Sequence, residues 1–156
     1  MDLKQAIRSS YLAQGLSESQ LESLYALAEW RSFNAGDEIL RQFDESRDMM
    51  ILASGVAHIQ TVVGEPIGLI KPGMPMGEIS FLDGKPRSGT VVAKEPCDVV
   101  VFAAEPLIEL LVSSPELSAR CLRNISRVLC ARLRTANQNL AALMALDESE
   151  VNSYRR

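Results

Sequence analysis

The chain has 156 residues, of which 47% are hydrophobic, and its formal net charge is −4. This length suits one domain with a substantial core and excludes a second full domain. The acidic balance argues against a surface built throughout for nucleic acid, and no apolar run approaches the roughly 18 residues that cross a bilayer. The charged N-terminus lacks the apolar centre of a signal peptide, so we expect a cytoplasmic protein that does not bind membranes.

The first predicted element is a helix near the N-terminus. Ser17 is a suitable N-cap, and Gln20 follows at the spacing of a capping box. Apolar residues then recur at helical spacing at Leu21, Leu24, Leu27 and Ala28. We therefore assign residues 1–32 to an N-terminal helical segment.

The middle of the chain, from Phe33 to about Val101, has a different pattern. Short apolar runs alternate with turns rich in Gly, Pro and Asp, which is typical of antiparallel strands. His58 lies in one alternating run and is expected to be structural. We predict an α+β fold, in which residues 33–105 form an antiparallel β-roll like a jelly-roll barrel, with helices at both ends.

Inside this region lies the segment GEISFLDGKPRSGT, residues 77–90. It predicts a short helix between Gly77 and Gly84, whose free N–H groups would accept an anion close to the backbone. Arg87 can hold a phosphate with two parallel hydrogen bonds. Ser88 and Thr90 add hydroxyl groups, so the residues together indicate a phosphate cradle.

Glu78 does not fit a simple phosphate site, because its carboxylate would repel the ligand. It fits if it accepts a hydrogen bond from a ligand hydroxyl while it pairs with Arg87. Such a ligand carries both a phosphate and a hydroxyl, as a ribose phosphate does. The alternative from spacing alone is an ordinary loop with a surface Glu–Arg pair.

The last predicted element is a long helical region over residues 106–146, followed by a tail over residues 147–156. It carries a coiled-coil spacing, hereafter the seam, formed by Leu122, Ser126, Leu129, Leu133, Ala136, Leu140 and Leu143. We expect its first turns, near Leu122 and Ile125, to pack on the roll, and the part beyond Leu129 to pair with a second copy. Four arginines predict a solvated face, with a nucleic acid or an acidic partner as the alternative: Arg120, Arg123, Arg127 and Arg134.

The remaining reactive residues predict no catalysis. Cys97, Cys121 and Cys130 lack zinc-knuckle spacing, and the last two would lie on opposite faces of one helix, so we expect inert thiols. A phosphodiesterase requires a metal cluster or a general acid and base, and neither is suggested by one His without clustered carboxylates. We predict no enzyme, no catalytic residues and no metal site.

The segment GEISFLDGKPRSGTVVA closely resembles the phosphate-binding cassette of the cyclic nucleotide-binding domain family. That family includes the catabolite activator protein, kinase regulatory subunits and nucleotide-gated channels. The flanking stretches AEWRSFNAGDEIL, MMILASGVAHI and LIKPGMPMGE are similar to the family's strands around the cassette. The resemblance covers about residues 16–146 and implies that the ligand is cAMP or cGMP, without any other cofactor.

The resemblance also implies roles for individual residues. Glu78 would accept from the ribose 2′-hydroxyl, and Arg87 would hold the charged exocyclic oxygen of the cyclic phosphate. The other implied ligand contacts come from Ser88 and from residues of the same segment, Gly77, Ile79, Ser80, Gly89 and Thr90. Thr135 and Asn137 of the long helix match positions that contact the base.

Two positions depart from the family pattern. Gly89 stands where Ala is common, which loosens the backbone near the phosphate. Gln42-Phe43-Asp44 replaces the usual Gln-Gly-Asp turn. That turn must therefore differ, or Phe43 must find an apolar neighbour.

The resemblance implies a regulatory module that binds a cyclic nucleotide, responds through a shift of its C-terminal helix and forms a homodimer. The family's transcription factors continue into a helix-turn-helix domain, of which the sequence shows no recognition helix, so we expect no specific DNA binding by this chain. The chain would be either a stand-alone sensor or a piece of a larger protein, with an effector protein as a further partner. The alternative is the same fold used for protein association or for another ligand, such as a cyclic dinucleotide.

Overall fold

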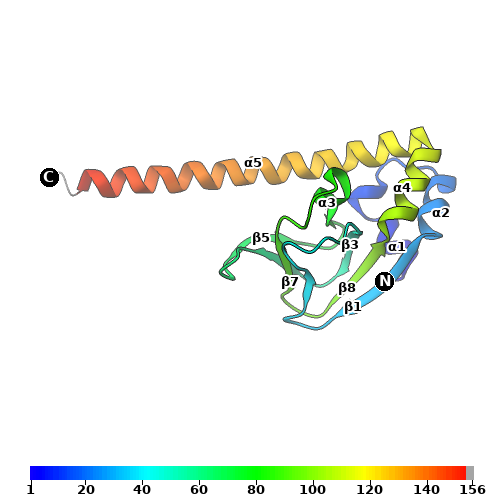
Figure 1. The fold of residues 1–156 in the computed structure, drawn as a ribbon, viewed down its shortest axis with the longest axis horizontal. Helices are drawn as coiled ribbons and strands as arrows, with labels where there is room; N and C mark the ends of the chain where they lie inside the picture. The colour runs from blue at the N-terminus through cyan, green and yellow to red at the C-terminus, as the bar shows by residue number, and fades with distance from the viewer. Residues whose placement is uncertain (154–156) are drawn as a thin grey trace. The chain divides into compact units, whose positions relative to one another are not determined.

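The computed structural model describes the backbone of residues 1–153 and the side chains of residues 1–145. The elements in chain order (Figure 1) are α1 (Leu3–Arg8), the 3-10 turn η1 (Tyr11–Ala13), α2 (Glu18–Tyr25), β1 (Ala28–Phe33), β2 (Glu38–Leu40), β3 (Met49–Ser54), β4 (Ala57–Gln60), β5 (Pro66–Ile70), β6 (Pro75–Met76), α3 (Glu78–Asp83), β7 (Thr90–Ala93), β8 (Cys97–Phe102), α4 (Ala104–Ser113) and α5 (Pro115–Ser153). The contacts within the chain divide it into two units, Met1–Ile125 and Ser126–Arg156. The two units are described separately.

The first unit contains two four-stranded antiparallel sheets. Their strand orders are β1-β8-β3-β6 and β2-β7-β4-β5. Side chains of both sheets meet in one core, which consists of Ile39, Leu40, Met50, Leu52, Ala57, Ile70, Met76, Val91, Ala93, Cys97, Val99 and Val101. This arrangement confirms the predicted antiparallel roll with helices before, within and after it.

The N-terminal helices test the predictions made from capping residues and from helical spacing. Ser17 and Gln20 form the predicted capping box of α2. The helix ends at Tyr25, however, and Ala28 begins β1 by pairing with Phe102, so the helical spacing of Leu27 and Ala28 was misleading. Pairing with β8 overrides the local pattern here. The sequence reading also missed α1, although Asp2 and Gln5 form a second capping box.

The beginning of α5 is fixed to the N-terminal segment by polar contacts. Buried Asn124 donates from Nδ2 to the carbonyls of Leu12 (2.8 Å) and Gln14 (2.9 Å). Arg120 donates from Nη1 to the carbonyl of Gly15 at 2.6 Å, so it does not belong to a purely solvated face. The other three arginines of that predicted face, Arg123, Arg127 and Arg134, are exposed.

The seam is separate from the face of α5 that the first unit buries. Leu117, Cys121, Asn124 and Ile125 are buried, whereas Leu122 is 39% exposed. Ile125 is therefore buried, as expected, whereas Leu122 is exposed, unlike the expectation.

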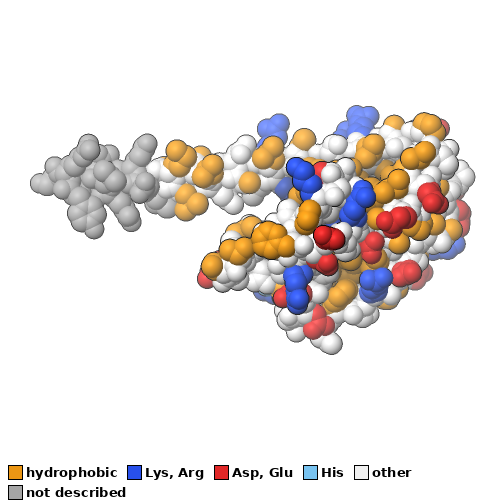
Figure 2. Space-filling view, in the orientation of Figure 1, with side chains coloured by type: hydrophobic (Ala, Val, Ile, Leu, Met, Phe, Trp, Pro, Cys, Tyr) orange, Lys and Arg blue, Asp and Glu red, His pale blue; other side chains and the backbone are white. Residues whose placement is uncertain are grey.

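The second unit consists of helix only in its described part. The seam leucines Leu133, Leu140 and Leu143 are 58–65% exposed, and Figure 2 shows hydrophobic side chains along this stretch of α5. Helix α5 continues to Ser153, so the predicted tail is helical to that residue, and residues 154–156 lie outside the described part. No described helix is long and apolar enough to cross a membrane.

The three thiols are free, and two of them are buried. Burial raises the pKa of Cys121 to about 11 and also raises the pKa of Cys97. Cys130 is exposed on α5. Burial therefore supports the expectation of an inert thiol for Cys97 and Cys121 and not for Cys130.

Asp98 joins three strands of the first sheet. Its carboxylate accepts hydrogen bonds from the hydroxyls of Ser32 on β1 (2.7 Å) and Ser54 on β3 (2.9 Å). These bonds lower the pKa of Asp98 below its ordinary value, and the bond from Ser32 has the larger effect.

The lowered pKa of Asp98 predicts an acid-dependent loss of stability. The folded state binds this proton less readily than the unfolded state, so the contribution is complete above the unfolded pKa of about 4 and is lost as pH falls through the folded pKa. Asp98→Asn should destabilise the protein by about 1 kcal/mol at pH 7 and by less below pH 4. Urea unfolding of both proteins at several pH values measures this, and a difference that does not change with pH would contradict it.

Candidate functional site

The cassette helix α3 is bounded by two glycines in the left-handed conformation. Gly77 (φ 76°) is its N-cap and Gly84 (φ 71°) its C-cap, as the sequence predicted. A Cβ on Gly77 would lie 2.7 Å from both Nη1 of Arg87 and the carbonyl oxygen of Asp48. Only glycine therefore fits between the backbone and the guanidinium at this position.

Two charged side chains of the cassette are almost completely buried. Glu78 is 2% exposed and Arg87 is 3% exposed. Burial of this kind is rare for ionised groups and requires compensating hydrogen bonds or charges. The alternative of an ordinary loop with a surface Glu–Arg pair is therefore wrong.

The guanidinium of Arg87 is held by oxygen atoms from two segments. Nη1 donates to the Gly77 carbonyl at 3.0 Å, and Nη2 donates to the Asp48 carbonyl at 2.7 Å and to Ser46 Oγ at 3.1 Å. Burial lowers the pKa of Arg87, while the charges of Asp48, Asp44 and Glu78, in that order, oppose the shift.

One donor of Arg87 is not used. Its Nε is buried and has no hydrogen-bond partner in the structure. A buried N–H of a cation without an acceptor costs free energy, so this position favours an incoming anion.

The turn before β3 lies against the cassette through backbone hydrogen bonds. The N–H of Phe43 donates to the Arg87 carbonyl (3.0 Å), and the N–H of Arg87 donates to the Asp44 carbonyl (2.8 Å). Gln42 adds two bonds, from its N–H to Thr90 Oγ1 and from Nε2 to the Ser88 carbonyl. Sequence reasoning missed this contact, which no local pattern marks.

Phe43 has a left-handed backbone conformation, which favours glycine. Its φ is 69°, and its side chain is 72% exposed, so it has not found the apolar neighbour that we expected as one outcome. The left-handed conformation costs a residue with a Cβ about 1–2 kcal/mol. The turn therefore carries backbone strain at Phe43.

Phe43→Gly should therefore stabilise the protein. Relief of strain, reduced by the greater backbone entropy of glycine, gives an expected gain of about 0.5–1 kcal/mol. Glu45→Gly is a matched control in the same exposed segment, without a positive φ, and should destabilise. Urea unfolding compares the two variants, and a loss of stability in Phe43→Gly would contradict the strain.

The other predicted contact residues lie around the same segment. Ser80 is buried, Ile79 is 42% exposed and Ser88 is exposed, while Gly89 and Thr90 are half-buried at the start of β7. A Cβ on Gly89 would only reach ordinary contact distance from Ile59, 3.5 Å, so the departure from Ala is not required by packing.

Thr135 and Asn137 belong to α5 in the second unit and are exposed. The Thr135 hydroxyl donates to the Ala131 carbonyl at 3.1 Å within the helix. Their predicted contact with a nucleotide base stays a prediction.

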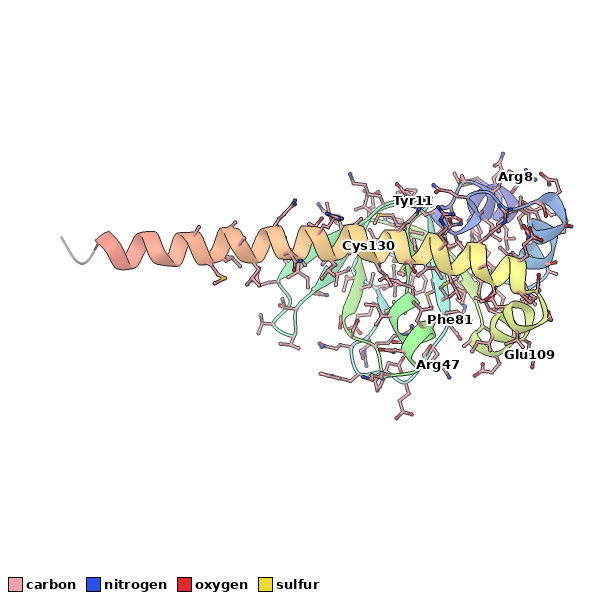
Figure 3. The ribbon with its side chains drawn as sticks, turned by 90° about the horizontal axis from the view of Figure 1, so that it is seen from above. Arg8, Tyr11, Arg47, Phe81, Glu109 and Cys130 are labelled. Carbon is pink, nitrogen blue, oxygen red and sulfur yellow. The ribbon has the colours of Figure 1, made fainter. Side chains whose placement is uncertain are left out.

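A second arginine lies at the opposite end of α3. Cζ and Nη2 of the Arg47 guanidinium lie 3.8 Å from the place that a Cβ would take on Gly84. Figure 3 labels Arg47 near Phe81 of α3. The Nε of Arg47 is also buried without a partner. Among the described residues, no group of three or more His, Cys, Asp or Glu side chains could hold a metal ion.

Comparison with known proteins gives the family. Residues 30–114 match the family described as "Cyclic nucleotide-binding domain". The chain is 28% identical over 132 residues to Glutaminase 1 of Bradyrhizobium diazoefficiens, covering 85% of this chain and 21% of that protein. It is 27% identical over 141 residues to the Cyclic AMP receptor protein of Thermus thermophilus, covering 88% of this chain and 63% of that protein.

The solved structures agree with the sequence match. A cyclic nucleotide-binding domain from Methylobacillus flagellatus superposes with a TM-score of 0.76 at 23% identity, over 89% of this chain and 81% of that one. The chain spans about a fifth of the length of the glutaminases that it matches. The match over more than half of the sequence, together with the roll and its glycine-bounded cassette, shows that the chain belongs to the cyclic nucleotide-binding domain family.

Proposed function

We propose that the chain is a non-catalytic sensor that binds a 3′,5′-cyclic nucleotide, cAMP or cGMP. The observation that carries the proposal is the buried Arg87, whose Nε has no acceptor and whose Nη1 lies beneath the Gly77 N-cap of α3. A phosphate would supply the missing acceptor and a further negative charge next to a cation that burial disfavours. The similarity to a cyclic AMP receptor protein supports the same ligand class.

The proposal gives each cassette residue a role. Arg87 binds the exocyclic phosphate oxygen and Glu78 accepts from the ribose 2′-hydroxyl. The Ser88 hydroxyl and the backbone N–H groups near Gly77, Ile79 and Ser80 hold the phosphate and sugar, with Gly89 and Thr90 beside them. Because the Nε of Arg87 is buried, its fork or the segment around it must move to receive the ligand.

The wider organisation is part of the proposal. Residues 33–105 bind the nucleotide, and residues 106–146 pair two copies along the seam. Residues 1–32 supply the N-terminal helices and most of β1, the first strand of the roll. Thr135 or Asn137 contacts the base. The ligand shifts α5, and this shift signals to an effector protein in the cytoplasm. The exposed leucines Leu133, Leu140 and Leu143 favour a second copy over solvent as their neighbour.

Calorimetric titration with cAMP and with cGMP tests the proposal. We expect one nucleotide per chain and no hydrolysis product after prolonged incubation. Heat with a cyclic dinucleotide alone would support the alternative ligand. No heat with any of these ligands would support use of the fold for protein association.

Glu78→Ala distinguishes two roles of this carboxylate. If Glu78 accepts from the 2′-hydroxyl, the variant should lose about 1.5–3 kcal/mol of affinity for the ribonucleotide, the value of a hydrogen bond to a charged group. Its affinity for the 2′-deoxy analogue should change much less. Equal losses for both ligands, measured by calorimetry, would mean that Glu78 acts only by orienting the Arg87 guanidinium.

A further inference from the structure

Asp48 accepts two long-range hydrogen bonds, one through its backbone and one through its side chain. Its carbonyl accepts from Nη2 of Arg87 at 2.7 Å, and its carboxylate oxygen Oδ1 accepts from the N–H of Ala104 at 3.1 Å. The pairing of Met49 with Phe102 explains the second bond, because it places the residue before β3 next to the residues that follow β8. One residue thus contacts both the cassette and the beginning of α4.

Helix α4 needs this acceptor. Its N-cap is Ala103, which has no side-chain oxygen, and no cap within the local sequence replaces it. The N–H of Ala104 would otherwise be one of the unpaired donors of the first turn. A carboxylate at this end also interacts favourably with the helix dipole. The Asp48 carboxylate therefore satisfies the first N–H of α4 from 56 residues away.

The contacts of Arg87 fix the position of Asp48. Nη2 holds the segment before β3 at two points, Ser46 Oγ and the Asp48 carbonyl. A guanidinium that binds a phosphate with two parallel hydrogen bonds needs two neighbouring N–H groups on one edge. If that edge includes Nη2, the phosphate competes with these two oxygens for the same donors.

We propose that Asp48 is a positioning residue that links Arg87 to the N-terminus of α4, so that occupation of Arg87 by a phosphate alters the capping of α4. The ligand-dependent part rests on the proposed function; the link between Arg87 and α4 does not. Helix α4 ends at Ser113, and α5 begins at Pro115, so a change at Ala104 reaches the start of the long helix through one short rigid element. Arg87 Nη2 can bond either to the segment before β3 or to a phosphate. A phosphate shifts the equilibrium between these two arrangements because it competes for the same donors.

The first arm of the test uses no ligand. Arg87→Gln removes the charged fork. Arg47→Gln is the control, because it removes an equal charge from the segment before β3 while it leaves the bonds of Arg87 to Ser46 and Asp48 in place. Amide exchange of Ala104, measured by NMR, should accelerate in Arg87→Gln by about 2- to 30-fold, the range expected for a weakened cap. In Arg47→Gln it should stay within about twofold of wild type. Equal rates in the two variants would overturn the link.

The second arm adds saturating cAMP and restores the cap locally. Asp48→Ala removes the link, and Ala103→Ser in the same chain supplies a conventional N-cap. We expect cAMP to change the exchange of the Leu107 amide in wild type and not in the double variant. The same change in both would overturn the ligand-dependent part.

Two further measurements keep the outcomes separate. Asp48→Asn keeps an oxygen acceptor for Ala104 and replaces Asp48→Ala if that variant does not fold; it should retain most of the wild-type response. If wild type shows no calorimetric heat with cAMP or cGMP, the proposed function fails, and the comparison of Arg87→Gln with Arg47→Gln still decides whether the link exists.

Discussion

Arg87→Ala should reduce the affinity for a cyclic nucleotide by about 2–5 kcal/mol, the loss that follows truncation of one partner of a buried, hydrogen-bonded charge pair. The variant removes the buried Nε of Arg87, which has no acceptor in the structure, together with both Nη groups. Calorimetric titration of wild type and variant measures the difference. Unchanged affinity would place the phosphate elsewhere on the protein.

Loss of Arg87 also leaves the carbonyls of Gly77 and Asp48 without their donor, so a control for folding is needed. Urea unfolding of Arg87→Ala provides it, and Arg47→Ala is the matched variant for affinity, because its buried Nε also lacks a hydrogen-bond partner but lies at the other end of α3. We expect its affinity to stay within a few-fold of wild type, about 1 kcal/mol or less. Arg87→Lys keeps the charge without the fork and should fall between the two. A large loss in Arg47→Ala would show that Arg87 is not the only arginine of this region on which the affinity depends.

The sequence predicted the structure correctly where residues a few positions apart determine it. The capping box of Ser17 and Gln20, and the glycines that bound α3, each act within a few residues. Their conformations were therefore predictable from backbone chemistry alone. Leu27 and Ala28 show the limit of such signals, because strand pairing with β8 decided their conformation.

The partners of Arg87 could not be predicted in the same way. Ser46 and Asp48 lie about 40 residues away in the sequence, and one of the two acceptors is a backbone carbonyl, which every residue has. No residue type or spacing marks such an acceptor. The fold determines it through the position of the segment before β3. For the same reason the sequence did not reveal that Asp48 caps α4.

Leu133→Glu combined with Leu140→Glu should convert a dimer into a monomer. In a paired seam these positions would place carboxylates in a desolvated interface, which weakens association by about 100-fold or more. The matched control is Ala131→Glu with Gln138→Glu, which adds the same charge at exposed positions two residues before each leucine, on the side of α5 away from the seam. The control should stay dimeric.

Equilibrium sedimentation with and without cyclic nucleotide measures the prediction. The seam variant should keep its cassette folded, because Leu133 and Leu140 are 62% and 58% exposed and lie outside the unit that contains the roll. If Thr135 or Asn137 contacts the base, pairing and ligand binding are coupled, typically by about 1–3 kcal/mol, and the monomeric variant should differ from wild type in affinity by that amount. A wild-type chain that stays monomeric at high micromolar concentration, with and without nucleotide, would rule out the seam and leave its leucines as a contact surface for a different protein.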